Sequence, residues 1–84
     1  METLCKIAGG KVEALEFRVT KEAGFCSIPL QELNLRSDLL IASITRKGKP
    51  ITPRGNDTIE VGDSVVVVTT HSGITTINDI FIKK

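Results

Sequence analysis

The chain has 84 residues, of which 40% are hydrophobic and 25% are charged, a balance typical of one small globular domain and too apolar for a disordered chain. Eleven Lys and Arg residues stand against ten Asp and Glu residues, which leaves a formal net charge of +1. This near-neutral balance and the lack of Trp and Tyr argue against a nucleic-acid-binding domain, because such domains usually carry a basic surface and aromatic stacking platforms.

Residues 1–11 show little hydrophobic periodicity and contain Ala8-Gly9-Gly10, a composition typical of linkers. We therefore expect residues 1–11 to be a linker or a ragged chain end, and residues 12–84 to form one folded domain. No unbroken apolar run exceeds four residues, far fewer than the roughly 20 residues of a membrane-spanning helix. The domain is expected to be soluble and cytoplasmic, without direct insertion into a membrane.

Two short elements are predicted at the start of this domain. Residues 12–19 alternate between apolar and polar side chains, as a half-buried strand requires, and the buried face carries Leu15, Phe17 and Val19. Residues 27–33 indicate a short helix, with Pro29 in its first turn and Ser27 as its N-terminal cap.

The stretch from residue 39 to residue 70 predicts the centre of a sheet. Strict alternation along 39–46 divides the side chains between two faces, one with Leu40, Ala42 and Ile44 and the other with Leu39, Ile41, Ser43 and Thr45. The second face is partly polar and is expected to be covered by something other than the main core. Two prolines confine residues 50–53 to an edge strand, whereas the four consecutive valines in residues 64–70 predict a central strand covered on both sides.

Residues 72–81 predict a C-terminal helix, because Ile74, Ile77 and Phe81 recur at helical spacing after Ser72, a candidate cap. Three β-branched residues in a row lower its intrinsic propensity, so packing has to stabilise it. The predicted fold class is therefore α+β: a small mixed, mainly antiparallel β-sheet with a short helix after the first strand and a C-terminal helix.

Residue types that carry catalysis are sparse, and we expect no enzyme and no metal site. His71 has no recognisable nucleophile beside it and is interpreted as a surface residue at a strand end. Cys5 and Cys26 lack metal-ligand spacing, and Cys26 is better explained by packing than as a reactive thiol. Asp57 and Asp63 lie in turn sequences, where carboxylates usually accept hydrogen bonds from backbone N–H groups.

Three arginines, Arg36, Arg46 and Arg54, are the charges best suited to an anionic ligand, because a guanidinium can bind a phosphate through two hydrogen bonds. The alternative is that each is a solvated surface charge.

A longer motif gives the sequence a family resemblance. I-x-R-x-G is followed by I-x-P-x-G-x-D-x-I-x-x-G-D-x-V-x-V, formed here by Ile44, Arg46, Gly48, Ile51, Pro53, Gly55, Asp57, Ile59, Gly62, Asp63, Val65 and Val67. With EALEFRV and SIPLQELNLR upstream in the same order, it resembles the C-terminal regulatory domain of TrkA-type potassium transport proteins, also called the RCK C-lobe, over residues 12–81.

The resemblance implies a mixed α/β lobe that forms a homodimer and follows a Rossmann-type nucleotide-binding domain. It implies a ligand-sensing domain of a Trk/Ktr-type potassium uptake system, whose partner is a membrane potassium channel or transporter subunit at the inner face of the cell membrane. No nucleic acid partner and no resident cofactor are expected. In some members the dimer cleft binds cyclic di-AMP, and the matching positions are Asn34, Leu35, Arg36, Ala42, Ser43, Ile44 and Pro53.

Two other functions remain open from the residues alone. The small core and the many Ile and Val residues fit a purely structural dimerisation module without a ligand. A small β-barrel that binds RNA would explain the I-x-x-G-D-x-V hairpin of residues 59–65, but the near-neutral charge disfavours it.

Overall fold

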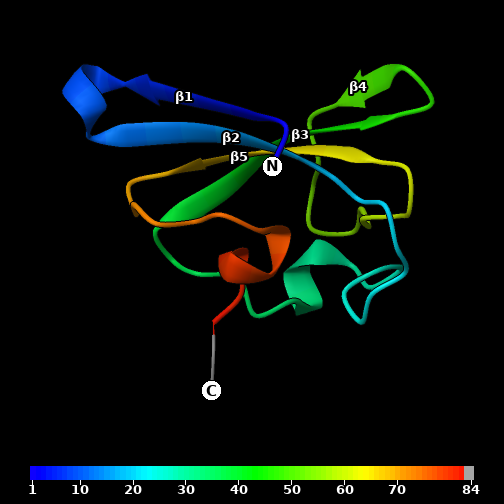
Figure 1. Cartoon of the computed structure of the whole chain (residues 1–84). Coiled ribbons are helices and arrows are strands. Elements are labelled where there is room, and N and C mark those ends of the chain that lie inside the picture. The colour runs from blue at the N-terminus through cyan, green and yellow to red at the C-terminus, as the bar shows by residue number, and fades with distance from the viewer. Residues whose placement is uncertain (83–84) are drawn as a thin grey trace.

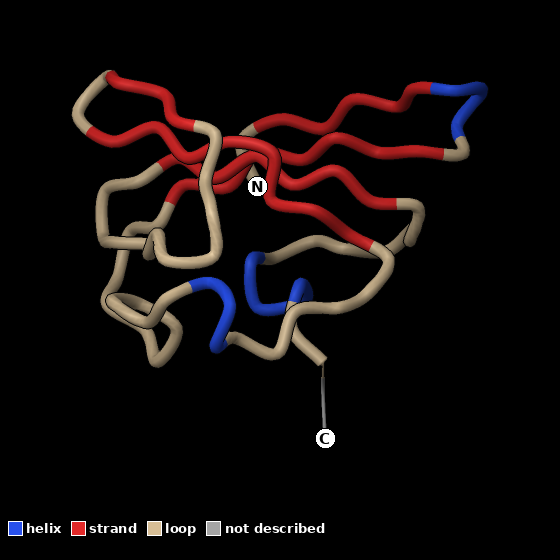
Figure 2. The backbone as a smooth tube through the Cα atoms, turned by 180° about the vertical axis from the view of Figure 1, so that it is seen from behind, coloured by secondary structure: helices blue, strands red, loops and turns tan. Residues whose placement is uncertain are grey.

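A computed structural model describes residues 1–82 and shows a five-stranded sheet with 3₁₀ turns and loops packed on one side (Figures 1 and 2). The strands are β1 (Thr3–Ile7), β2 (Val12–Arg18), β3 (Leu39–Arg46), β4 (Lys49–Ile51) and β5 (Ser64–Thr69). They lie in the order β1-β2-β5-β3-β4, and every neighbouring pair is antiparallel. The 3₁₀ turns are η1 (Ala8–Gly10), η2 (Leu30–Glu32) and η3 (Ile77–Ile80).

The core lies on one face of this sheet, around β5. This strand lies between β2 and β3, which confirms the central position predicted from its valines. Val65 and Val67 are fully buried and stand opposite Phe17 and Leu15 of β2. Loop and turn residues cover the same face and complete the core: Phe25, Leu30, Ile59, Ile74 and Ile80.

The prediction that β5 is covered on both sides is wrong for one copy of the chain. Val66 and Val68 point to the other side of the sheet, because side chains alternate along a strand, and they stay partly accessible. Both figures show η2 and η3 on the opposite side. We call the accessible side the open face; its apolar residues are Cys5, Ile7, Val12, Ala14, Leu40, Val66 and Val68.

A β-bulge in β3 changes which of its side chains reach the core. The pairing of β3 with β5 shifts between Ile41 and Ser43, so Ala42 is the additional residue. Ile41 and Ile44 are both buried, with 7% and 0% of their surface exposed, whereas Leu40 is 66% exposed. Strict alternation placed Leu40 with Ile44, and that prediction is wrong because the bulge reverses the faces within the strand.

The short helix predicted over residues 27–33 is only the turn η2. Its first two backbone donors bond to the loop before β5, the Leu30 N–H to the Asp57 carbonyl and the Gln31 N–H to the Gly55 carbonyl (both 2.9 Å), and the Glu32 N–H makes a single 3₁₀ bond to the Pro29 carbonyl (2.8 Å). Ser27 has a φ of 63°, and its hydroxyl donates to Glu60 (2.7 Å). The Ser27 side chain therefore joins its own loop to Glu60, in the loop before β5, and does not cap a helix.

The C-terminal helix predicted over residues 72–81 is likewise reduced to η3. Asp79 Oδ2 accepts hydrogen bonds from the N–H groups of Thr75 (3.0 Å) and Thr76 (3.0 Å). These bonds hold the preceding segment extended, with Thr76 at φ −129° and ψ 161°, although Ile80 still reaches the core. Residues 1–82 contain no α-helix, so the fold is an antiparallel sheet with 3₁₀ turns rather than α+β.

Residues 1–11 form a strand and a turn where a linker was predicted. β1 pairs with β2 along its whole length. Gly9 and Gly10, with φ of 68° and 86°, lie in the reversal between the two strands and adopt backbone angles that glycine tolerates best. The domain boundary at residue 12 stays a prediction.

The bulge predicts that substitutions at the neighbouring residues Leu40 and Ile41 have very different effects on the free energy of unfolding. Ile41→Ala should lower the free energy of unfolding by about 2–4 kcal/mol, because it leaves a cavity in the core. Leu40→Ala should change it by less than about 0.5 kcal/mol, since this side chain is exposed. Urea unfolding measures both, at a concentration where light scattering gives equal molar masses. An equal or larger loss for Leu40→Ala would contradict the bulge.

Candidate functional site

Arg46 and Asp63 form an ion pair at the end of β3. Arg46 donates through Nε to Asp63 Oδ1 (2.9 Å) and through Nη2 to Asp63 Oδ2 (2.8 Å) and the Thr58 carbonyl (2.9 Å). Asp63 Oδ2 also accepts the backbone N–H of Glu60 (2.8 Å), and the Asp63 side chain is completely buried. Both carboxylate oxygens accept hydrogen bonds from within the chain, so the pair has a structural role and holds the end of β3 against the turn before β5.

The contacts of this pair keep both groups charged. Burial alone would raise the pKa of Asp63, but the hydrogen bonds from Arg46 and from the Glu60 N–H outweigh it and hold that pKa below its ordinary value. The same carboxylate raises the pKa of Arg46. The turn role predicted for Asp63 agrees with its bond from the Glu60 N–H, but the sequence did not reveal its second partner, Arg46 of β3.

A second charged cluster consists of Arg36, Asp38 and His71. Arg36 donates through Nε to Asp38 Oδ1 (3.1 Å) and through Nη2 to Asp38 Oδ2 (3.1 Å). Arg36 Nη2 also lies 3.1 Å from His71 Nδ1. Because arginine can only donate, His71 Nδ1 accepts this bond. The cluster is about one-third exposed at Arg36 and Asp38, with 32% of each side chain accessible, so solvent and ligands can reach it.

The bidentate pairing perturbs both charged members of the cluster. Hydrogen bonds from Arg36 lower the pKa of Asp38 below its ordinary value, and those to Asp38 raise the pKa of Arg36. The guanidinium is therefore already paired with an internal anion, and an external anion would have to displace it.

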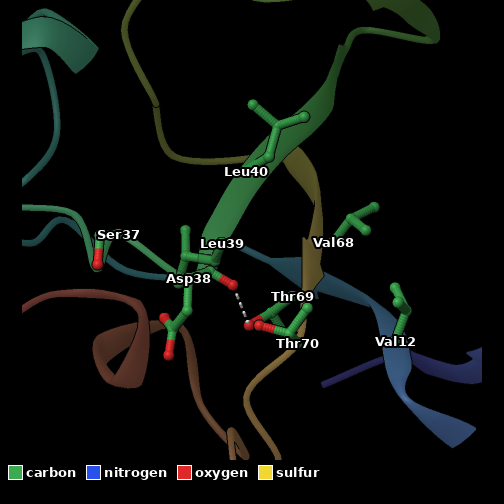
Figure 3. A pocket seen from close by; sticks show the side chains of 8 residues that line it. All are labelled: Val12, Ser37, Asp38, Leu39, Leu40, Val68, Thr69 and Thr70. Carbon is green, nitrogen blue, oxygen red and sulfur yellow. Dashed lines mark hydrogen bonds between the residues drawn. The ribbon is translucent and has the colours of Figure 1, made fainter.

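Two hollows lie on either side of Asp38. One, of about 330 Å³, is lined by Arg36, Ser37, Asp38 and Ile82. The other, of about 370 Å³, lies at the end of the open face and is lined by Val12, Ser37, Asp38, Leu39, Leu40, Val68, Thr69 and Thr70 (Figure 3). A hydrogen bond from the Thr69 hydroxyl to the Asp38 carbonyl (2.8 Å), dashed in Figure 3, joins β5 to the residue before β3 beside this hollow. The charged cluster thus adjoins an apolar surface.

The ligand residues predicted from the resemblance fall into separate groups. Asn34, Leu35 and Arg36 run beside the chain after η3, where the Asn34 carbonyl accepts the Ile82 N–H (2.7 Å). The others are Ala42, Ser43 and Ile44 at the bulge of β3 and Pro53 after β4. Ser43 lies on the open face opposite Val66, but Ile44 is fully buried, out of reach of a surface ligand.

Residues 14–82 match the TrkA-C domain family. The chain belongs to this family. Among curated relatives of this TrkA-C domain, the Trk system potassium uptake protein TrkA homolog of Archaeoglobus fulgidus is 32% identical over 74 residues, which cover 88% of this chain and 17% of the relative. The TrkA homolog 2 of Methanosarcina mazei is 28% identical over 74 residues, covering 88% of this chain and 16% of the relative. The TrkA-C domain thus spans about a sixth of the length of these relatives.

The TrkA-C domain also resembles a solved structure described as "Structure of RCK domain with cda". The two superimpose with a TM-score of 0.58 at 22% sequence identity, over 64% of this chain and 76% of that one. At this level of identity the comparison shows a shared fold.

Sequence reasoning missed two members of the charged cluster of this TrkA-C domain, Asp38 and His71. Residues two apart in an extended segment point to the same side, a signal that could have joined Arg36 to Asp38. The third member follows from strand pairing, because Leu39 stands opposite Thr69 and the chain reaches His71 two residues later.

Residues 1–82 contain neither a cluster of metal ligands nor a membrane-spanning helix. No three side chains of His, Cys, Asp or Glu come together there in a way that could hold a metal ion. No helical segment in this part of the chain has the length and apolarity needed to cross a membrane.

The buried ion pair predicts how stability changes in acid. The folded-state pKa of Asp63 lies below its unfolded value of about 3.9, so the pair contributes stability that is fully present above about pH 4 and is lost as pH falls through the folded-state pKa. Asp63→Asn should be about 2 kcal/mol less stable at neutral pH and should lose less of its remaining stability in acid. Urea unfolding from pH 7 to pH 3 measures both.

Glu22→Gln, at an exposed loop position, is the matched control and should keep the acid dependence of the unmodified chain. An Asp63→Asn variant with the same acid dependence would contradict the assignment of this carboxylate as the sensitive group.

Proposed function

We propose that the TrkA-C domain is a ligand-sensing regulatory domain of a Trk/Ktr-type potassium uptake system, and that it acts as a homodimer. The proposed ligand is an anionic regulator of the cyclic di-AMP kind, bound at Arg36. The carrying observation is that this guanidinium lines a hollow of about 330 Å³ next to the apolar open face. The family, the TrkA relatives and the RCK domain described with cda support the proposal.

The open face provides the surface on which a second copy would sit. Leu40 is 66% exposed and lines the same hollow as Asp38 (Figure 3). In a two-fold dimer each residue occurs twice, so a two-fold dinucleotide can meet Arg36 of each copy with one phosphate. Predicted contacts from Asn34 and Ser43 would flank it, one beside the arginine and one on the open face.

Ligand binding at this site is an exchange of partners. Asp38 holds both donors of Arg36 that face it, and a phosphodiester carries the same single negative charge as this carboxylate. The favourable free energy must therefore come from the other contacts of the ligand, with bases on the apolar surface. Such binding shifts the equilibrium between two arrangements of the dimer only to the extent that the ligand binds one arrangement more tightly than the other. The bias would reach a membrane channel or transporter subunit through the full-length regulator, at the cytoplasmic side of the membrane.

A second candidate is a purely structural dimerisation module without its own ligand. The observation that favours it is the pairing of Arg36 with Asp38, which satisfies the arginine in the absence of any ligand. The apolar open face would then serve only to join two regulators.

Calorimetric titration with cyclic di-AMP tests the proposed site. Arg36→Gln should weaken binding at least about tenfold, because the phosphate would then lie beside the Asp38 carboxylate without a compensating cation, a repulsion of about 1.4 kcal/mol or more. Asp38→Asn should tighten it, because the competing carboxylate is removed. Arg54→Gln, at an exposed arginine outside the cluster, is the control and should bind like the unmodified chain. An unmodified, folded dimer that does not bind would favour the structural module.

The dimer surface has its own test. Leu40→Glu should halve the molar mass measured by light scattering at micromolar concentration, because it places charges on the open face, while circular dichroism shows an intact fold. Val61→Glu is the matched control, since Val61 is 48% exposed in the turn before β5. An unchanged mass for Leu40→Glu would contradict a dimer through the open face.

A further inference from the structure

The two edge strands of the sheet, β1 and β4, differ in their protection against further pairing (Figure 1). β4 contains Pro50, and Pro53 follows two residues after its end; prolines are residues that natural edge strands use to prevent pairing. β1 has no proline, runs for five residues, is exposed at each of them, and pairs only with β2 in the described part of the chain. Its outer backbone groups are thus available to another strand.

Exposed apolar side chains gather on the same strand. Leu4 is 47% exposed and Ile7 is 49% exposed, and Met1, two residues before β1 begins, is 49% exposed. An accessible edge strand with apolar side chains is a template for strand addition. β1 also lies outside residues 14–82, the part matched by the family, so its contacts are not described by the family match.

We propose that β1 pairs antiparallel with β1 of a second copy of the chain, about a two-fold axis at Leu4, which joins two sheets into one. Residue numbers that face each other across such an axis add up to eight. This register sets Leu4 opposite Leu4, and it sets Glu2 opposite Lys6 twice. Opposite charges directly across a strand pair are stabilising, so the charge pattern of β1 is complementary to itself.

Other registers lose this complementarity. An axis at Cys5 sets Lys6 opposite Leu4 and leaves Glu2 without a charged partner across the pair. An axis at Thr3 sets Glu2 opposite Leu4 and leaves Lys6 beyond the paired residues. The charges therefore select the axis at Leu4.

This contact goes beyond the proposed function, because β1 contributes no residue to either hollow at Asp38. Two different two-fold contacts on one chain build an assembly of four chains if they close, and a longer row of chains if they do not. The β1 contact would thus link open-face dimers to one another.

Charge substitutions at the axis test the pairing. Leu4→Lys and Leu4→Glu should each halve the weight-average molar mass in sedimentation equilibrium relative to the unmodified chain, because each places two like charges opposite one another. An equimolar mixture of the two variants should restore the mass, because Lys then faces Glu. Val61→Lys, at a similarly exposed apolar position, should leave it unchanged. Equal masses for all variants, a monomeric unmodified chain, or a mixture that fails to associate would overturn the proposal.

Disulfide cross-linking in a thiol redox buffer tests the register independently. Leu4→Cys with Cys5→Ser should give a covalent dimer, because facing Cα atoms lie about 4.5–5.5 Å apart, within disulfide reach. Lys6→Cys with Cys5→Ser should not, because the two positions would lie roughly 13 Å apart along the strands. Equal cross-linking of both, or a Cys5-linked dimer of the unmodified chain, would overturn the register.

Cyclic di-AMP titration of Leu4→Lys should match the unmodified chain, so failure of the Arg36 site and failure of β1 pairing give different results.

Discussion

The buried carboxylate of Asp63 is the constraint on which the arrangement of the strands depends. Its side chain accepts two hydrogen bonds from Arg46 at the end of β3, and its backbone carbonyl accepts the N–H of Val19 just after β2 (2.9 Å). A buried carboxylate without partners is costly. The ends of β2 and β3 must therefore meet the start of β5 in one arrangement, and this arrangement fixes which valines of β5 enter the core.

The main strands could be predicted from the sequence because their pattern is local. Alternation predicts residues 12–19 and the prolines predict an edge at residues 50–53, and both agree with the structure. The bulge at Ala42 could not be predicted, since either alternation along Leu-Leu-Ile-Ala-Ser-Ile leaves apolar side chains to bury. β1 was missed because all its residues are exposed, so it has no burial pattern. The helices failed because isoleucines at helical spacing can equally anchor a 3₁₀ turn that packs on a sheet.

For the candidate site, the sequence indicated which residue types could bind an anion, but it did not indicate which side chains lie in contact with one another. The guanidinium of Arg36 could be singled out from its residue type and its place in the family pattern. Its pairing with Asp38 and its contact with His71 depend on an extended segment and on the pairing of β3 with β5, which no local pattern reveals. Ile44, which the same family pattern predicts as a ligand residue, is fully buried in the core, and its ligand role stays a prediction.

The pairing of Arg36 with Asp38 also affects how the TrkA-C domain meets the mixture of solutes in a cell. An exposed arginine without an internal partner would attract polyanions of many kinds, including nucleotides and RNA, whatever their shape. Here the carboxylate two residues away cancels that charge at short range, and the near-neutral surface adds no long-range attraction. Under the proposed function, a ligand would therefore be selected by its shape and by its contacts with the open face rather than by its charge.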